Sequence, residues 1–461
     1  MTIHQLNRLK GGRMKISVVG LGKLGSPLLA TLASKDHQVI GVDLNPEFVN
    51  KLNSGLAPVQ EPHLQELLTA HRSKISATQD YAEAVLNTEV TFVIVPTPSE
   101  KDGLFSNRYL LQAVEQLGLA LRKKRGYHLV VITSTVTPGA IGGEIKSALE
   151  RTSDKKVGVD VGLCYSPEFI ALGTVIRNML YPDMVLIGES DEQAGDILEE
   201  IYRSVCENKP PVRRMNWINA EIAKIAINTF ITTKISFANM LSDICQHIQG
   251  ADVDVVTDAL GLDSRIGSKY IRAAVGFGGP CFPRDNLALA ALGKKIGVRT
   301  ELACATQQIN EYQNDRLLDL IKLYDKSKKI GVLGLSYKPG TYVAEESQGV
   351  DLANLLVEQG YAVSVYDPMA LTEAKKTLSE KAHIASSVQE CLERSETLLI
   401  MIPWPEFSQA ITPKILQSLD SRKVILDCWR MLSKASFMEV CDLIYLGCGS
   451  SYILQDSLTT L

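Results

Sequence analysis

The sequence has no apolar run long enough to cross a membrane. The longest runs, such as residues 398–402, fall well short of the roughly 18 residues that a spanning helix needs. Residues 1–13 are polar and lack the apolar core of a signal peptide. We therefore expect a cytoplasmic protein without a membrane partner, in which residues 1–13 form a short flexible tail.

Positive charge is not in excess either. The 461 residues include 48 Lys and Arg against 52 Asp and Glu, a formal net charge of -4, with a dense basic run at residues 122–125. A protein that binds nucleic acid needs cations to neutralise the phosphate backbone. This charge balance therefore argues against a nucleic-acid partner.

The cysteines and histidines show no spacing typical of a metal site. The nine cysteines are odd in number and none lies in a Cys-x-x-Cys pair, and the seven histidines have no metal-ligand spacing. A disulfide framework and a thiolate zinc site are both unexpected on this pattern. We predict no metal, and we interpret eight of the nine cysteines as packing residues in a reducing cytosol.

A nucleotide-binding pattern opens the chain. A β-branched strand at 16–19 leads into a glycine-rich turn, a helix, a second strand at 38–42 and then Asp43. The turn consists of Gly20, Leu21, Gly22, Lys23, Leu24 and Gly25. Its glycines permit a tight turn, a close approach of backbone N–H groups to a pyrophosphate, and packing of the helix on the strand. Asp43 predicts NAD rather than NADP, because a carboxylate accepts from the ribose 2′-hydroxyl and repels a 2′-phosphate.

Polar residues follow three further predicted strands. These strands span residues 90–95, 129–133 and 161–165, and they are followed by Thr97, Thr135 and Glu168. Ligands bind at the carboxyl ends of strands in open α/β sheets, so these residues are candidates for the rim of an active site. Glu168 could instead lie in the first turn of a helix and stabilise its N-terminus.

The opening pattern recurs after a helical middle. Residues 220–261 have helical spacing, and from residue 329 the order of strand, turn and strand returns and ends in Asp367. We predict an α/β fold with two Rossmann-like, doubly wound parallel-sheet domains joined by a long central helical segment. The second turn has lost the Gly-x-Gly-x-x-Gly pattern, so a different nucleotide is expected there. The predicted domains are 14–205, which binds NAD, 206–325, which is helical and contains Cys281, and 326–461.

Cys281 lies in the most unusual segment of the chain. Glycines and prolines crowd the thiol within residues 276–285, and Asp285 follows four residues later. A thiol near cations is a candidate nucleophile, and the alternative is a tight turn around an inert, buried cysteine. Lys224 and Asn228, at i and i+4, share one helix face and could hold a developing oxyanion, although this spacing also fits a solvated face.

Together these motifs resemble those of the nucleotide-sugar 6-dehydrogenases, the family that oxidises UDP-glucose and GDP-mannose. Within this family the sequence is most similar to the members that oxidise UDP-glucose. The resemblance runs from residue 14 to residue 430. The family signature Gly-Phe-Gly-Gly-x-Cys-Phe-Pro-[Lys/Arg]-Asp is matched by residues 276–285. Supporting motifs lie at residues 134–136, 166–169, 220–228 and 334–338.

The resemblance implies a four-electron oxidation of the sugar C6 alcohol with two NAD+ in succession. Cys281 would capture the aldehyde as a thiohemiacetal, which a second hydride transfer turns into a thioester. Lys224 and Asn228 would stabilise the oxyanion. A covalent route would explain why a cysteine stands in the signature at all.

The family also implies the remaining roles. Asp285 and Thr135 would order a water, and Glu168 would act as base in thioester hydrolysis. Arg265 would reach across an interface, which implies a homodimer or higher homo-oligomer through the central domain. The implied cofactor contacts are Gly20, Leu21, Gly22, Lys23, Leu24, Gly25, Asp43, Thr97, Thr135 and Glu168. The implied nucleotide-sugar contacts are Phe169, Lys224, Asn228, Arg265, Tyr270, Arg272, Phe277, Gly278 and Lys338.

The sequence departs from the family pattern in three places, and these departures affect the expected identity of the sugar and part of the expected contact with the cofactor. Leu172 replaces a carboxylate, Glu345 replaces an arginine, and the late Asp-Gly-Arg becomes residues 427–430. A UDP-sugar is the favoured substrate, with UDP-glucose first and UDP-N-acetylhexosamine or GDP-mannose as alternatives. Further alternatives are a two-electron dehydrogenase of the 3-hydroxyacid type and a catalytically silent nucleotide-sugar-binding protein.

Overall fold

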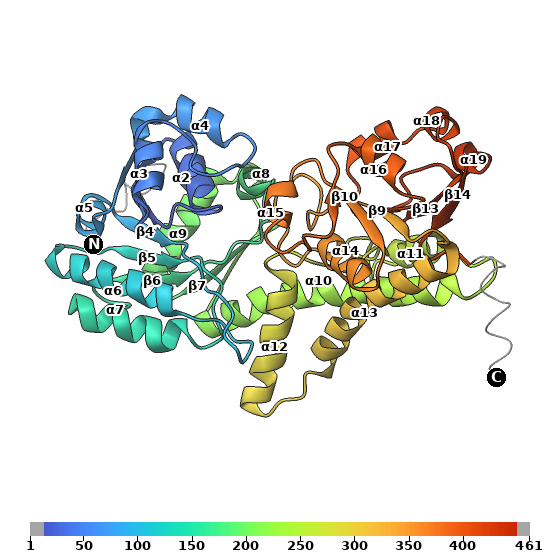
Figure 1. Ribbon diagram of the computed structural model, residues 1–461. Helices are drawn as coiled ribbons and strands as arrows, with labels where there is room; N and C mark the ends of the chain where they lie inside the picture. The colour runs from blue at the N-terminus through green and yellow to red at the C-terminus, as the bar shows by residue number, and fades with distance from the viewer. Residues whose placement is uncertain (1–12, 450–461) are drawn as a thin grey trace. The chain divides into compact units, whose positions relative to one another are not determined.

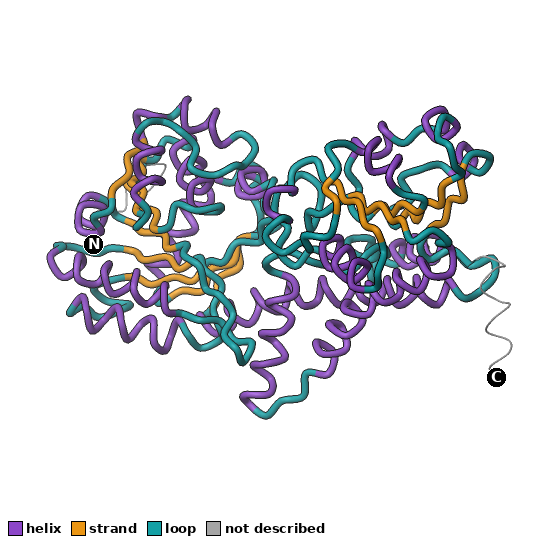
Figure 2. Tube along the Cα trace, viewed as in Figure 1, coloured by secondary structure: helices purple, strands orange, loops and turns teal. Residues whose placement is uncertain are grey.

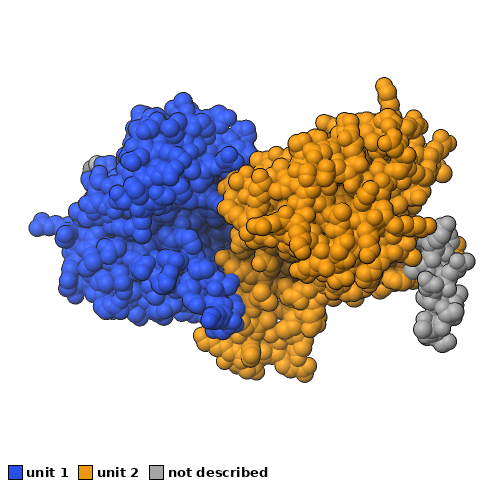
Figure 3. Space-filling model, viewed as in Figure 1, with its two compact units in different colours: residues 1–226 blue, residues 227–461 orange. Residues whose placement is uncertain are grey.

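The computed structural model describes residues 13–449, and the chain divides into two compact units, residues 1–226 and 227–461 (Figure 3). Each unit is built on its own β-sheet, as the strands in Figure 2 show. The expected tail, residues 1–13, lies outside the described residues except for Arg13. Among residues 13–449 no helix combines the length and the apolar character that a membrane crossing requires.

The first unit contains an eight-stranded sheet of order β3-β2-β1-β4-β5-β6-β7-β8. The first six of these strands are parallel, and the chain switches direction of winding between β1 and β4. β7 runs antiparallel to β6, with Cys164 opposite Glu189. The prediction of a parallel sheet therefore holds for the first six strands and is wrong for the pairing of β6 with β7. The strands are β1 (Lys15–Val19), β2 (Gln38–Val42), β3 (Ile75–Thr78), β4 (Val90–Val93), β5 (Leu129–Ile132), β6 (Gly162–Tyr165), β7 (Val185–Glu189) and β8 (Val212–Met215).

Helices cover both faces of this sheet because successive strand side chains point to opposite sides. Ile16 and Val18 enter one apolar core and Val19 enters the other. In Figure 1, α6 and α7 lie on one face and α2 and α3 on the opposite face. The helices are α2 (Gly25–Ser34), α3 (Pro46–Asn53), α4 (Leu64–Ala70), η1 (Arg72–Lys74), α5 (Tyr81–Asn87), α6 (Arg108–Lys123), η2 (Ile141–Ile145), α7 (Lys146–Ser153), α8 (Val175–Leu180) and α9 (Glu192–Val205).

The second unit repeats the first six strand positions. Its sheet has the order β11-β10-β9-β12-β13-β14 and is parallel throughout. The predicted pair of doubly wound α/β domains is therefore confirmed. The strands are β9 (Lys329–Leu333), β10 (Ala362–Tyr366), β11 (His383–Ile384), β12 (Thr397–Ile400), β13 (Lys423–Asp427) and β14 (Cys441–Tyr445). Its shorter helices are α14 (Gln348–Glu358), α15 (Leu371–Ala374), α16 (Val388–Arg394), α17 (Pro405–Ala410), α18 (Pro413–Gln417) and α19 (Lys434–Phe437).

The central helical segment is built around one long helix. α10 (Trp217–Gln246) has 30 residues, about 45 Å at 1.5 Å per residue, and the division between the two units falls within it, after Ala226. α10 therefore supplies side chains to both units. The other helices of the segment are α11 (Val253–Leu262), α12 (Phe282–Ile296) and α13 (Glu301–Tyr324).

Candidate active site

The glycine-rich turn after β1 has the backbone geometry that a dinucleotide site needs. Gly20 has φ +94°, and a Cβ at Gly25 would lie 1.7 Å from the Gly20 carbonyl oxygen, so α2 can begin here only with glycine. A Cβ at Gly22 would meet nothing within 4 Å. The backbone is thus open at Gly22, beside the N-terminus of α2, where N–H groups can bind phosphate. Within the same turn Leu21 is buried, Leu24 is half-buried and Lys23 is exposed.

Asp43 lies against this turn at the end of β2. Its Oδ2 accepts a hydrogen bond from the Leu21 N–H at 2.7 Å, and its Oδ1 accepts one from the Asn45 N–H at 2.8 Å. The side chain is half-buried, so the carboxylate is fixed while part of it stays accessible. This position suits a carboxylate that accepts from a ribose hydroxyl of bound NAD.

The loops after β4 and β5 are bonded to each other. Thr97 Oγ1 donates to the Thr135 carbonyl oxygen at 2.6 Å, and Ser134 Oγ both donates to the Val95 carbonyl oxygen at 2.6 Å and accepts from the Val95 N–H at 2.9 Å. Thr97 is buried and Thr135 is half-buried. The Thr97 hydroxyl therefore holds the loop that contains Thr135, in addition to any contact with a cofactor.

Glu221 of α10 fixes the same loop and was given no role by sequence reasoning. Its carboxylate is fully buried and accepts from the N–H groups of Gly139 at 2.7 Å and Ile141 at 2.8 Å. Burial raises the pKa of Glu221, and the backbone donors oppose that shift. The sequence signal was spacing, because Glu221, Lys224 and Asn228 at i, i+3 and i+7 share one helix face.

Lys224 and Glu168 meet after β6. Lys224 Nζ donates to the Glu168 backbone carbonyl oxygen at 2.7 Å and lies 4.7 Å from the centre of the Phe169 ring. The next helix, α8, begins only at Val175, so Glu168 does not lie in the first turn of a helix. Burial raises the pKa of Glu168 to about 7, while the Lys224 charge and a hydrogen bond from Tyr202 lower it. A carboxyl group with such a pKa can exchange protons near neutral pH.

The segment after Glu168 is held by a carboxylate that sequence reasoning missed. Glu61 accepts from the Gly173 N–H at 3.0 Å and from the Val175 N–H at 2.7 Å. Leu172, which replaces a family carboxylate, is half-buried and packs against the apolar core of this face. No local pattern predicts the Glu61 contact, because its partners lie 112 and 114 positions away.

Two buried asparagines of the second unit hold the segment that leads to Cys281. Asn239 of α10 accepts from the Ala274 N–H at 3.0 Å and donates to the Val275 carbonyl oxygen at 3.2 Å. Asn310 of α13 accepts from the Phe277 N–H at 2.7 Å and donates to the Phe277 carbonyl oxygen at 3.0 Å. These amides replace the hydrogen bonds of a neighbouring strand and fix the backbone before the thiol.

The thiol of Cys281 is exposed at the start of α12. Gly279, with φ +84°, lets the chain turn, donates its N–H to the Glu345 carbonyl oxygen at 3.1 Å, and packs so closely on Tyr337 that a Cβ would lie 2.5 Å from its ring. Cys281 is the N-cap residue of α12, where the helix dipole favours an anionic sulfur. An inert, buried cysteine does not fit this position.

Asp285 and Asn228 form a buried pair one turn after Cys281. Asn228 Nδ2 donates to Asp285 Oδ2 at 2.6 Å, and the Asp285 N–H donates to the Cys281 carbonyl oxygen at 2.8 Å. Asp285 Oδ1 accepts no hydrogen bond from the described residues and has Arg284 Nε 3.5 Å away. Both side chains are buried, so Asn228 does not lie on a solvated face.

The residues implied to bind the nucleotide-sugar differ in exposure. Arg265 is exposed and pairs with Asp263 at 2.6 Å, Tyr270 is exposed with φ +63°, and Arg272 is exposed 3.6 Å from Asp254. Lys338 is half-buried, and Phe277 and Gly278 are buried. The Phe277 ring packs edge-on against Phe282, with ring centres 6.3 Å apart. Its ring therefore supports the cysteine segment rather than an open surface.

Residues 427–430, which depart from the family pattern, contact the central segment. Arg430 has φ +55° and pairs with Asp252 at 2.6 Å and Asp254 at 3.3 Å, at the start of α11. Trp429 Nε1 donates to the Met401 carbonyl oxygen at 2.7 Å. Arg430 thus anchors the end of β13 to the start of α11, and Trp429 binds it to the end of β12.

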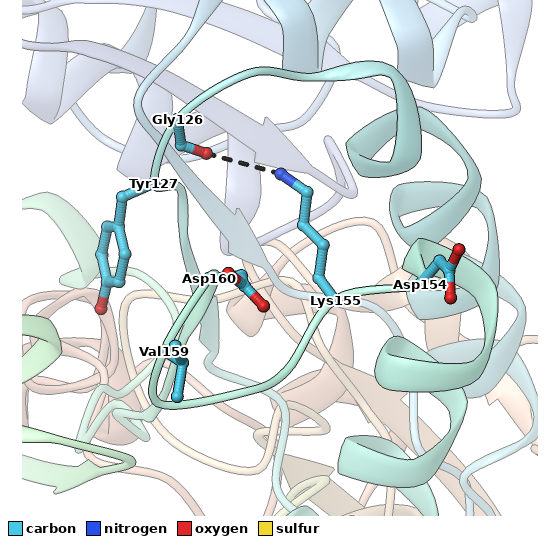
Figure 4. A pocket seen from close by; sticks show the side chains of 6 residues that line it. All are labelled: Gly126, Tyr127, Asp154, Lys155, Val159 and Asp160. Carbon is cyan, nitrogen blue, oxygen red and sulfur yellow. Dashed lines mark hydrogen bonds between the residues drawn. The ribbon is translucent and has the colours of Figure 1, made fainter.

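One cavity lies away from these residues. It has a volume of about 380 Å³ and is lined by Gly126, Tyr127, Asp154, Lys155, Val159 and Asp160 (Figure 4). Its residues precede β5 and β6, so it opens at the amino edge of the sheet, opposite the carboxyl edge where Gly20 and Thr135 lie. It is therefore not the cofactor site.

The cysteines other than Cys281 are not all packing residues. Six are buried, Cys448 is half-buried, and Cys304 on α13 is exposed, which corrects the expectation for Cys304. The nine cysteines all lie within residues 13–449, and none of them forms a disulfide. Within residues 13–449 no three His, Cys, Asp or Glu side chains converge as a metal site would require.

Comparison with known proteins identifies the family. Models of the UDP-glucose/GDP-mannose dehydrogenase family match the chain with their NAD binding domain over residues 14–206, their central domain over 218–312 and their UDP binding domain over 331–434. The chain is 35% identical over 423 residues to a UDP-glucose 6-dehydrogenase of Haloferax volcanii, covering 89% of this chain and 97% of that protein. It is 36% identical over 358 residues to a GDP-mannose 6-dehydrogenase of Pseudomonas aeruginosa, covering 77% and 81%.

A solved structure agrees with these matches. The UDP-glucose dehydrogenase of the hyperthermophilic archaeon Pyrobaculum islandicum superposes with a TM-score of 0.85 at 33% identity, covering 94% of this chain and 97% of that one. The family, the activity class and the NAD cofactor predicted from the sequence are confirmed. The chain belongs to the UDP-glucose/GDP-mannose dehydrogenase family and is an NAD-dependent nucleotide-sugar 6-dehydrogenase.

Proposed function

We propose that the enzyme oxidises UDP-glucose to UDP-glucuronate through a thioester on Cys281. The position of Cys281 supports the covalent route, because the thiol is exposed at the positive end of α12, one turn before the buried Asp285–Asn228 pair. The extent of the sequence matches supports UDP-glucose as the substrate. The chain is almost equally identical to the UDP-glucose and the GDP-mannose dehydrogenases, but the match covers 97% of the first relative and 81% of the second.

The overall reaction is R–CH2OH + 2 NAD+ + H2O → R–COO⁻ + 2 NADH + 3 H+. The Gly20–Gly25 turn and Asp43 would hold NAD+, which would accept the hydride of each oxidation. The Cys281 sulfur adds to the C6 aldehyde to give a thiohemiacetal, which loses a hydride and a proton to become a thioester. The sulfur leaves when water attacks the thioester carbon. Lys224 and Asn228 would stabilise the oxyanion. Asp285, whose Oδ1 accepts no hydrogen bond from residues 13–449 and has Arg284 Nε 3.5 Å away, would order a water together with Thr135.

The thioester route predicts two NADH per molecule of UDP-glucose. We expect Cys281→Ser to bind NADH normally and to form UDP-glucuronate at least about 10³-fold more slowly, because it lacks the thiolate nucleophile. Cys304→Ser is the matched control, since it removes the other exposed thiol, and we expect it to keep wild-type activity. One NADH per sugar, or normal acid formation by Cys281→Ser, would contradict the route.

We also propose that the enzyme is a homodimer that pairs through α10. Phe230, Phe237 and Ile244 recur every seven residues along α10 and are 65%, 43% and 48% exposed. Such a stripe is typical of a helix that packs on a second helix. We expect a dimer by size-exclusion chromatography with light scattering and a monomer for Phe230→Asp/Phe237→Asp. A wild-type monomer at micromolar concentration would contradict this.

A further inference from the structure

Two hydroxyl side chains lie behind the Glu168 carboxyl group. Tyr202, on α9, places its hydroxyl oxygen 3.4 Å from Glu168 Oε1 and 2.8 Å from Ser166 Oγ. Ser166 Oγ in turn lies 2.9 Å from the Leu186 carbonyl oxygen of β7. Ser166 is 1% exposed, so this chain of contacts ends at a buried backbone acceptor and not at solvent.

Proton counting shows that these hydroxyls fit both protonation states of Glu168. Each hydroxyl has one proton to donate and can also accept. When Glu168 is protonated it donates to Tyr202, Tyr202 donates to Ser166, and Ser166 donates to the Leu186 carbonyl oxygen. When Glu168 is ionised, Tyr202 turns its proton to the carboxylate and Ser166 keeps its bond to Leu186. Neither state leaves a buried hydroxyl proton without an acceptor.

We propose that Tyr202 is a positioning residue whose hydroxyl rotates between Ser166 and Glu168, so that Glu168 can act first as base and then as acid during thioester hydrolysis. The inference rests on the proposed function, because it requires a thioester at Cys281. In that step the water oxygen bonds to the thioester carbon as one water proton passes to Glu168. The C–S bond then breaks, and Glu168 returns the proton to the leaving thiolate. The second water proton is lost as the carboxylic acid product ionises.

Among the described residues, two other titratable groups interact electrostatically with Glu168. Lys224 of α10 lies at its backbone carbonyl oxygen, and its charge lowers the pKa of Glu168. The Cys206 thiol follows α9, and burial, with the Glu168 charge, raises its pKa to about 12. Cys206 therefore stays neutral near pH 7 and takes no part in the proton exchange. Tyr202 is the hydroxyl donor that reaches the Glu168 side chain.

Tyr202→Phe tests the proposal by removing the hydroxyl and keeping the ring. The infrared band of the protonated Glu168 carboxyl group, identified by its loss in Glu168→Gln, reports its titration without any cofactor. We expect the midpoint to rise by about 0.5 to 1 pH unit, because the carboxylate loses a donor. Hydrolysis of the acyl-enzyme, followed by intact-protein mass spectrometry, should show the same upward shift. Ser166→Ala should lower both midpoints, because the Tyr202 proton then has Glu168 as its remaining acceptor.

Tyr127→Phe is the matched control, since it removes a half-buried phenol 3.3 Å from the Asp191 carboxylate at the amino edge of the sheet. We expect it to leave both midpoints in place. An unchanged midpoint in Tyr202→Phe overturns the proposal, and so does an upward shift in both Tyr202→Phe and Ser166→Ala, which would indicate loosened packing alone. If wild-type enzyme forms no acyl-enzyme, the proposed function fails, whereas the infrared titration still reports on Tyr202.

Discussion

At the scale of single residues, the carboxylates of this enzyme differ in what surrounds them. Glu168 is desolvated and has one weak hydroxyl donor, so its pKa lies near 7, whereas Asp43 accepts two backbone N–H groups at the edge of the sheet. A group that must take up and release a proton needs the first environment. The two backbone donors fix the position of the Asp43 side chain, as a contact with a ribose hydroxyl requires.

The raised pKa of Glu168 predicts a pH-dependent cost in stability. The folded state binds this proton more tightly than the unfolded chain, whose glutamates titrate near 4.5. Stability from this group is therefore fully present below about pH 4.5 and is lost as the pH rises to about 7. We expect Glu168→Gln to unfold at nearly the wild-type temperature at pH 5 but several degrees higher at pH 8, a difference of about 2 to 3 kcal/mol.

The exposed Glu66 of α4 supplies the control for this measurement. Glu66→Gln makes the same chemical change at the surface. We expect this variant to unfold at the wild-type temperature at pH 5 and again at the wild-type temperature at pH 8. A gain for Glu168→Gln that is the same at pH 5 and pH 8 would show that packing, not titration, is responsible.

At the scale of elements, one face of α10 binds loops in each of the two units. Glu221 binds the loop that contains Thr135, Lys224 binds the backbone at Glu168, and Asn228 binds Asp285. The spacing i, i+3, i+7 could be read from the sequence, since it follows from the 3.6-residue period. The partners could not, because each lies 56 to 82 residues away along the chain.

Local patterns explain how much of the fold the sequence predicts. Strand, glycine turn, helix and acid follow one another within residues 15–43, and the same order at residues 329–367 predicted the second sheet. The antiparallel strand β7 and the Glu61 contact to Gly173 were missed because both depend on distant pairing. Neither the direction of β7 nor the Glu61 contact leaves a periodic signal in the chain.

Removal of Glu221 should loosen the Thr135 loop without disturbing the helix. Glu221→Ala leaves two N–H groups without acceptors at a buried position, and alanine is a good helix former, so we expect a loss of about 2 to 4 kcal/mol. Hydrogen exchange at Gly139 and Ile141 should accelerate more than exchange in β5. Ile222→Ala, at a 47% exposed position on the same helix, is the control and should change neither. Uniform acceleration across the first unit would contradict a local role.

At the scale of the whole molecule, the two sheets share the order of six strands but differ in the environment of the acid that follows their second strand. Asp43 is half-buried, whereas Asp367 is fully buried. Asp367 Oδ2 accepts from the N–H groups of Leu335 at 2.8 Å and Ser336 at 2.9 Å, and its Oδ1 accepts from Met369 at 2.8 Å and Ala370 at 2.7 Å. Backbone N–H groups of the turn after β9 and of the loop after β10 therefore bind both oxygens of the buried Asp367, so this acid cannot accept from a ribose.

This contrast predicts one NADH site per chain. Isothermal titration calorimetry should give one NADH per chain in the wild type, and Asp43→Ala should weaken that site by about 10-fold or more, because the ribose loses a charged acceptor. Two NADH per chain, or unchanged affinity in Asp43→Ala, would contradict the assignment.

If one site serves two oxidations, NADH must leave and NAD+ must enter while the sugar stays on the enzyme. A covalent bond to Cys281 in the thiohemiacetal would hold the sugar during that exchange, before the second hydride transfer forms the thioester.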